Sequence, residues 1–155
     1  MSRILLASLV ACGLVIGAGV PARADLAPWD QAKVRGLAEQ LEDATKSLYD
    51  TFYKQPTPGA ASGQGQDYRR LKQEVRRVRL EASELASALG KGEGRDDTLP
   101  IYETLMVKVR DARELAGRVF TTQDVQQRAS AVRQLLNQLT PYYDPDAAPL
   151  QPATR

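Results

Sequence analysis

The side chains available for chemistry in this sequence are carboxylates, arginine, lysine and tyrosine, because it contains no histidine and one cysteine, Cys12. Without imidazole, the usual ligand of haem, copper and catalytic zinc is missing, and serine or cysteine nucleophiles lack their usual base. Carboxylates, lysine and tyrosine can transfer protons, but no spacing in the chain selects a pair of them. We therefore expect no catalytic residues, no metal site and no cofactor, and a protein that is not an enzyme.

The densest charge lies in residues 68–80, where the stretch YRRLKQEVRRVRL holds six basic residues and one acid, Glu74. Residues four apart are neighbours on a helix, so we expect Arg70 to pair with Glu74 and Arg77 to pair with Glu81. The other four basic residues have no acid four positions later and form a basic stripe of their own: Arg69, Lys72, Arg76 and Arg79.

Two interpretations of this basic stripe remain open. The stripe is either solvated or faces acidic residues of neighbouring helices, for which the candidates are Glu39, Glu42, Asp43, Asp50, Asp111 and Glu114. Alternatively, it faces lipid headgroups, lipopolysaccharide, a cell-wall polymer or an acidic partner. Each basic residue near an anionic membrane contributes about 1 kcal/mol, so four would give weak, salt-sensitive adhesion rather than anchoring.

The first 24 residues have the layout of a cleaved secretory signal peptide. Arg3 precedes an uncharged apolar run over residues 4–20, and the small residues Ala22 and Ala24 favour cleavage after Ala24. Two alternatives are an uncleaved anchor, since the run is near the lower length limit for spanning a membrane, and lipidation of Cys12, which ends a lipoprotein-like box. Cleavage predicts a periplasmic or secreted protein without a transmembrane anchor.

Cleavage also changes the charge balance of the chain. Loss of Arg3 and Arg23 leaves 19 basic and 19 acidic residues, so the expected mature chain, residues 25–155, has no formal net charge. The broad basic field that nucleic-acid binders use is therefore absent. We expect no nucleic-acid partner, and an envelope protein or an anionic envelope surface as the partner instead.

Apolar residues recur at spacings of three and four in four segments, which predicts amphipathic helices over about 26–54, 67–89, 99–119 and 122–140. The clearest seam lies in the second segment: Tyr68, Leu71, Val75, Val78, Ala82, Leu85 and Leu89. Such seams are typical of coiled-coil-like packing, and short connections favour an all-α, up-down-up-down four-helix bundle over residues 25–141. Alanines in the middle of several seams predict close helix packing with little room for a cofactor.

Local chemistry predicts where the helices begin and end. Pro28 fits the first turn of the first helix, Thr98 can cap the third, and Thr121, with an acid three residues later, can cap the fourth. The linker over residues 55–66 is rich in Pro, Gly, Ala and Gln, and the tail over residues 142–155 contains three prolines. We expect the linker to be mobile and the tail to be flexible, either extended or disordered.

All nine aromatic residues lie at predicted helix ends and gather at opposite ends of the bundle. One aromatic end cluster comprises Tyr49, Phe52, Tyr53, Tyr68 and Phe120. The other comprises Trp29, Tyr102, Tyr142 and Tyr143. Either the rings plug the two ends, with tyrosine hydroxyls reaching water, or one end is open and holds a small amphipathic ligand or a partner peptide.

The predicted architecture resembles that of many four-helix bundles of the bacterial envelope, although a likeness of fold says little about function. We expect an exported, non-enzymatic helical bundle of the bacterial cell envelope that acts as a scaffold or accessory protein through protein or envelope-surface interactions. The alternative is a module that binds a small amphipathic ligand at an aromatic end of the bundle.

Overall fold

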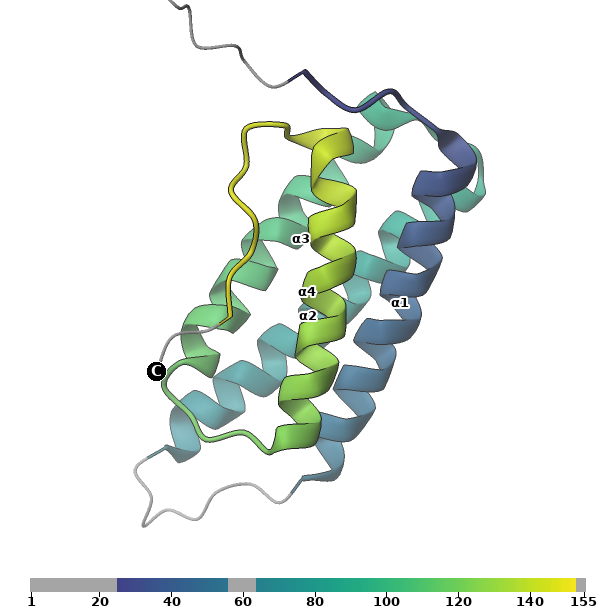
Figure 1. Cartoon of the computed structure of the whole chain (residues 1–155). Helices are drawn as coiled ribbons and strands as arrows, with labels where there is room; N and C mark the ends of the chain where they lie inside the picture. Colours follow the sequence, from purple (N-terminus) through teal and green to yellow (C-terminus); the bar gives the residue numbers. More distant parts are fainter. Residues whose placement is uncertain (1–24, 56–63, 153–155) are drawn as a thin grey trace, which may run out of the picture.

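Four α-helices make up the computed structural model of the chain, which describes residues 25–55 and 64–152 (Figure 1). The helices are α1 (Gln31–Lys54), α2 (Gly65–Gly90), α3 (Arg95–Ala116) and α4 (Gln123–Tyr143), and the described residues contain no strand. The predicted signal peptide, most of the predicted linker and residues 153–155 lie outside the described residues. No helix in the described ranges has a stretch that is both long and apolar enough to cross a bilayer.

The helices form an antiparallel four-helix bundle, as the sequence predicted. α1 packs against α2 and α4, and α2 also packs against α3. Gln31 at the start of α1 donates to the carbonyl of Leu89 at the end of α2, at 3.3 Å. At the opposite end, the Tyr53 hydroxyl donates to the carbonyl of Lys72 at 3.4 Å. α1 and α2 therefore run in opposite directions.

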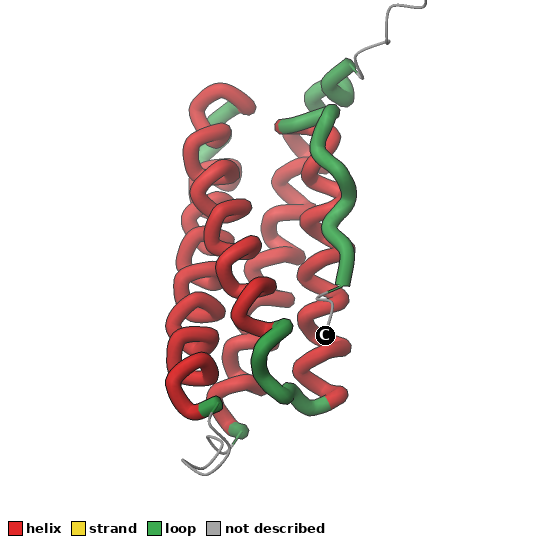
Figure 2. The backbone as a smooth tube through the Cα atoms, turned by 90° about the vertical axis from the view of Figure 1, so that its left-hand side faces the viewer, coloured by secondary structure: helices red, strands yellow, loops and turns green. Residues whose placement is uncertain are grey.

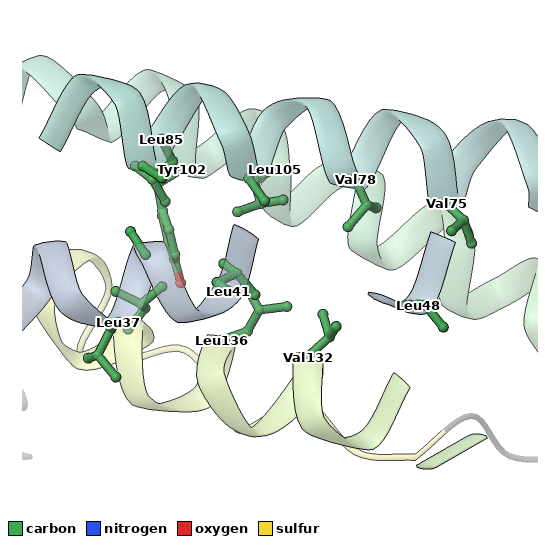
Figure 3. Close-up of a cluster of buried hydrophobic side chains, with 14 of the residues drawn as sticks. Leu37, Leu41, Leu48, Val75, Val78, Leu85, Tyr102, Leu105, Val132 and Leu136 are labelled. Atoms are coloured by element: carbon green, nitrogen blue, oxygen red, sulfur yellow. The ribbon is translucent and has the colours of Figure 1, made fainter. Parts of the chain in front are cut away.

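All four helices contribute apolar side chains to one core, part of which is drawn in Figure 3. The predicted seam of α2 is buried along its whole length, from Tyr68 to Leu89. Leu41 of α1, Leu85 of α2 and Leu136 of α4 are each 0% exposed. The spacing of three and four residues keeps these side chains on the inward side of each helix, which is why the seam could be read from the sequence.

α1 and α3 begin farther from their predicted starts than α2 and α4 do, because other side chains cap them. The Asp30 carboxylate accepts a hydrogen bond from the Lys33 backbone at 3.0 Å, so α1 starts after Pro28 rather than around it. The Asp97 carboxylate accepts from the Gly94 backbone at 3.2 Å, and α3 starts four residues before the predicted position. An acid in the first turn also suits the partial positive charge of a helix N-terminus.

The connection between α3 and α4 exists where the sequence placed it, but its cap differs. Thr122, not Thr121, caps α4, with its hydroxyl accepting from the Val125 backbone at 3.5 Å. Thr121 instead takes part in the turn, where the Gln126 side chain donates to its carbonyl at 3.1 Å.

α4 continues to Tyr143, three residues beyond its predicted end, although Pro141 removes one backbone donor. The Pro141 carbonyl accepts from the Ala27 backbone at 2.9 Å, and Tyr142 and Tyr143 are both 7% exposed, so packing holds the last turn in place. Residues 144–152 of the predicted tail contain no helix or strand and run back along the helices (Figure 2).

The second aromatic end cluster closes the end of the bundle where α3 starts and α4 finishes. Tyr102 stacks on Tyr143 with 4.3 Å between ring centroids, and Trp29 meets Tyr143 edge-on at 5.6 Å. One interpretation expected the tyrosine hydroxyls at this end to reach water. The hydroxyls of the two stacked tyrosines instead bind buried threonines. Tyr102 donates to Thr140 at 3.0 Å, and the hydroxyls of Tyr143 and Thr98 lie 2.9 Å apart. These two buried pairs join the first half of α3 to the last turns of α4.

The first prediction contrasts two leucines of α2. Leu85 is 0% exposed and Leu80 is 49% exposed. Leu85→Ala should lower the free energy of unfolding by about 2–5 kcal/mol because it empties part of the core. Leu80→Ala should lower it by less than about 1 kcal/mol. Urea unfolding followed by circular dichroism measures both, and equal losses would contradict the assigned core.

The second prediction concerns alkaline pH. Burial raises the pKa of Tyr102 and of Tyr143, and the hydrogen bonds to Thr140 and Thr98 only partly oppose this effect. The unfolded chain therefore ionises first, at about pH 10. The stability that the neutral tyrosines contribute is fully present below that pH and is lost as pH rises through the folded-state pKa. The urea midpoint should fall above about pH 10, and less steeply for the variant Tyr102→Phe/Tyr143→Phe; identical slopes would contradict the assignment.

Candidate functional site

α3 is attached to the bundle mainly through its first half. Its buried residues all lie in the first three turns: Thr98, Tyr102 and Leu105. The seam then continues with Val109, Ala112 and Ala116, which are only partly buried. Small side chains bury little apolar surface and so hold the second half weakly. α3 packs against α2 but makes few contacts with α4. The alanines were expected to bring helices together, but between α3 and α4 they leave space.

The space between α3 and α4 is an apolar groove of about 600 Å³. Side chains of α1 and α2 form its floor: Leu48, Phe52, Leu71, Val75 and Val78. Side chains of α3 and α4 form its walls: Val109, Ala112, Ala116, Val125, Ala129, Val132 and Leu136. Pockets for small molecules are typically about 300–1,000 Å³, mostly apolar and equipped with a few polar groups. The groove has the size and the lining of such a pocket.

Two arginines are the only charged side chains among the described residues that line the groove, Arg113 of α3 and Arg133 of α4. Within the described ranges neither has a carboxylate within 4.0 Å, and the five ion pairs there involve other arginines. Arg113 donates to the Pro152 carbonyl at 3.4 Å, and Arg133 donates to the Ser130 hydroxyl at 2.9 Å. The groove therefore combines an apolar interior with positive charge that no acid among residues 25–55 and 64–152 neutralises.

The C-terminal segment, residues 144–152, covers part of this groove. Leu150 lines it, together with Gln151 and Pro152. Asn137 of α4 holds Leu150 on both sides, because its side-chain oxygen accepts from the Leu150 backbone at 2.8 Å and its amide donates to the Leu150 carbonyl at 3.4 Å. In Figure 1 the segment runs from the end of α4 beside α3. A few local contacts thus place one wall of the groove.

The predicted basic stripe lies on the side of α2 that meets α1: Arg69, Lys72, Arg76 and Arg79. Lys72 lies over the rings of Tyr53 and Tyr68, at 4.8 and 5.5 Å from their centroids, and Arg79 lies over Tyr49 at 4.7 Å. The other two stripe residues are exposed. None of the four forms an ion pair within the described residues. Tyrosine rings, rather than the acids of neighbouring helices, accompany two of the four charges.

The local ion pairs of α2 differ from the predicted ones. Arg70 meets Asp67 at 4.0 Å and Arg77 meets Glu74 at 2.8 Å, in place of the predicted pairs Arg70–Glu74 and Arg77–Glu81. Each arginine therefore reaches an acid three residues earlier. Long side chains on a helix point back toward its N-terminus, which brings the preceding turn within their reach.

The structure divides the first aromatic end cluster into separate parts. Phe52 and Tyr68 stack at 4.9 Å in the core, while Tyr49 and Tyr53 lie against each other at 4.1 Å closer to the surface. The Tyr68 hydroxyl is buried without a hydrogen-bond partner in the described part of the chain, and burial raises its pKa. Phe120 is 72% exposed. The groove lies along the side of the bundle, and of this cluster only Phe52 lines it.

Arg113 and Arg133 were not among the predicted site residues because neither belongs to a basic run. A signal for them exists in the sequence: neither arginine has an acid three or four residues away in either direction. Residues at those distances are neighbours on a helix. A second signal is that the apolar side chains of the third seam become smaller from Tyr102 to Ala116. Smaller side chains bury less apolar surface, so this part of the helix is attached to the bundle most weakly.

Comparisons with known proteins give this chain no family. It matches no model of a protein family, no curated protein and no solved structure. A fold of this kind hosts many functions, so the fold transfers none of them to this protein. Its function has to be inferred from the groove and from the charges around it.

Proposed function

We propose that this chain is a non-enzymatic binding protein of the bacterial cell envelope that holds an amphipathic molecule in the groove between α3 and α4. The observation that carries the proposal is the apolar groove of about 600 Å³ where two neighbouring helices of the bundle fail to close. A protein that acts only as a scaffold does not require an apolar groove. Apolar surface that is open to water usually serves binding. This favours the ligand-binding alternative, with the side of the bundle in place of an aromatic end.

The chemistry of the lining supports binding rather than catalysis. The titratable groups among the described lining residues are the guanidinium groups of Arg113 and Arg133. A guanidinium group offers five N–H donors in a fixed fork and no acceptor, whereas a general base has to accept a proton from the substrate. The two guanidinium groups can hold and orient a polar group, which is the task of a binding site.

Export to the periplasm or beyond is part of the proposal. It is supported by the N-terminal pattern of Arg3, the apolar run over residues 4–20 and the small residues before Asp25. An amphipathic molecule that crosses an aqueous compartment has to shield its apolar part from water. A groove that buries this part would serve that need.

The third prediction tests the groove with a bulky side chain. Ala129 lines the groove, whereas Ala131, two residues later on α4, is exposed. The neutral apolar fluorophore N-phenyl-1-naphthylamine should bind the protein with increased emission. Ala129→Phe should fill the groove and lower the affinity at least about tenfold, or about 1.4 kcal/mol, while Ala131→Phe should leave it unchanged. Equal affinities in the two variants would show that the fluorophore binds elsewhere and would contradict the proposal.

The basic stripe supports a second candidate function, attachment to an anionic envelope surface. Arg69 and Arg76 are exposed, and Lys72 and Arg79 lie beside them over tyrosine rings. Cations held over aromatic rings retain their charge, so all four contribute to the field of this face. The interaction would be weak and sensitive to salt, because exposed charges are screened over about 8 Å at physiological ionic strength.

The fourth prediction separates the two halves of the stripe. Arg69→Gln/Arg76→Gln and Lys72→Gln/Arg79→Gln each remove two charges, so both should weaken binding to vesicles of anionic lipid in a sedimentation assay. Only the second variant should lower thermal stability, by about 0.5–1 kcal/mol for each cation–π interaction that it removes. Wild-type protein that fails to sediment with anionic vesicles at low salt would exclude this second function.

A further inference from the structure

The charges at the groove indicate what kind of ligand it takes. We infer that the ligand is an anionic single-chain amphiphile, an alkyl carboxylate, whose chain lies on the apolar floor and whose headgroup binds Arg113 and Arg133. This inference rests on the proposed function, since it names the ligand class of the same groove. It is carried by the lining, by the absence of acids from the described lining residues and by the present partners of the two arginines.

The two arginines create a positive potential over an apolar surface. Both are partly buried, and one comes from each wall of the groove. In the described part of the chain, the arginines in ion pairs each have an acid three or four residues away, whereas Arg113 and Arg133 have none at those distances. Partial burial strengthens the attraction between such charges and an anion. A guanidinium group also matches a carboxylate in shape, since it can donate two parallel hydrogen bonds.

The C-terminal segment shows where an oxygen atom of the ligand would lie. The Pro152 carbonyl accepts from Arg113 at 3.4 Å, and Leu150 places an apolar side chain in the same groove. The segment thus resembles the inferred ligand in two respects. It places an oxygen atom at Arg113 and an apolar side chain in the groove. A carbonyl is a weaker acceptor for a guanidinium group than a carboxylate is, so an alkyl carboxylate would replace this contact favourably.

The same segment favours a slender ligand over an amphipathic helix. A helix is about 10–12 Å across with its side chains, and residues 150–152 already line one side of the groove. A single alkyl chain can lie beneath or beside these residues. A helix would have to remove them and break the hydrogen bonds between Asn137 and Leu150.

The fifth prediction compares three amphiphiles that share a twelve-carbon chain: dodecanoate, dodecyl maltoside and dodecyltrimethylammonium. Isothermal titration calorimetry of the purified protein below the micelle concentrations should give dodecanoate the highest affinity. Its affinity should exceed that of the neutral maltoside at least about tenfold, as charge-assisted hydrogen bonds allow. Arg113→Gln/Arg133→Gln should abolish this difference and leave the affinity for the maltoside within about twofold.

The matched control is Arg35→Gln/Arg70→Gln, which removes two charges from exposed, ion-paired arginines that do not line the groove. It should keep the preference for dodecanoate. The inference is overturned, while the proposed function stands, if all three amphiphiles bind equally and Ala129→Phe weakens them all. It is also overturned if the control loses the preference as the groove variant does. If no amphiphile binds, the proposed function fails and the inference fails with it.

Discussion

Two buried pairs of hydroxyl groups, Thr98 with Tyr143 and Tyr102 with Thr140, determine how α3 meets α4. Each pair satisfies polar atoms that would cost free energy if buried alone, so the geometry at this end of the bundle is fixed. The stacked rings of Tyr102 and Tyr143 add apolar area to the same joint. Beyond Leu105, which is also buried, the residues of α3 are only partly buried or exposed. The helices are joined at one end, and the groove follows from that asymmetry.

Arginine and lysine supply the positive charge of the molecule in two different settings. On the face shared by α1 and α2, Lys72 and Arg79 lie over tyrosine rings, which give them a partner without cancelling their charge. At the groove, Arg113 and Arg133 donate to neutral oxygens and stand beside apolar walls. The first setting suits a broad anionic surface, and the second suits one anionic group attached to an apolar chain. The two proposals therefore concern separate surfaces of one protein.

Much of the fold could be predicted because one period governs it. The spacing of three and four residues in α2 put Leu85 inside and Leu80 outside, and the structure confirms both placements. Helix ends were harder to predict, because several residues near each end can cap it. Asp30 and Asp97 took that role, and α4 passed through Pro141 because the backbone of Ala27 and the packing of Tyr142 and Tyr143 hold its last turn. The two caps are local contacts chosen among several candidates, whereas the end of α4 depends on a partner that is distant in sequence.

The sequence by itself determined the helical class, the buried seams and the exclusion of imidazole and thiol chemistry from residues 25–155, because composition and period are local properties. Only the tertiary structure decided what the alanines of α3 do. Small side chains allow helices either to approach closely or to leave a gap, and the outcome depends on what holds the two helices elsewhere. Here the tyrosine–threonine joint at one end and the Leu150–Asn137 contact at the side settle it. The groove and its two arginines are therefore properties of the assembled bundle.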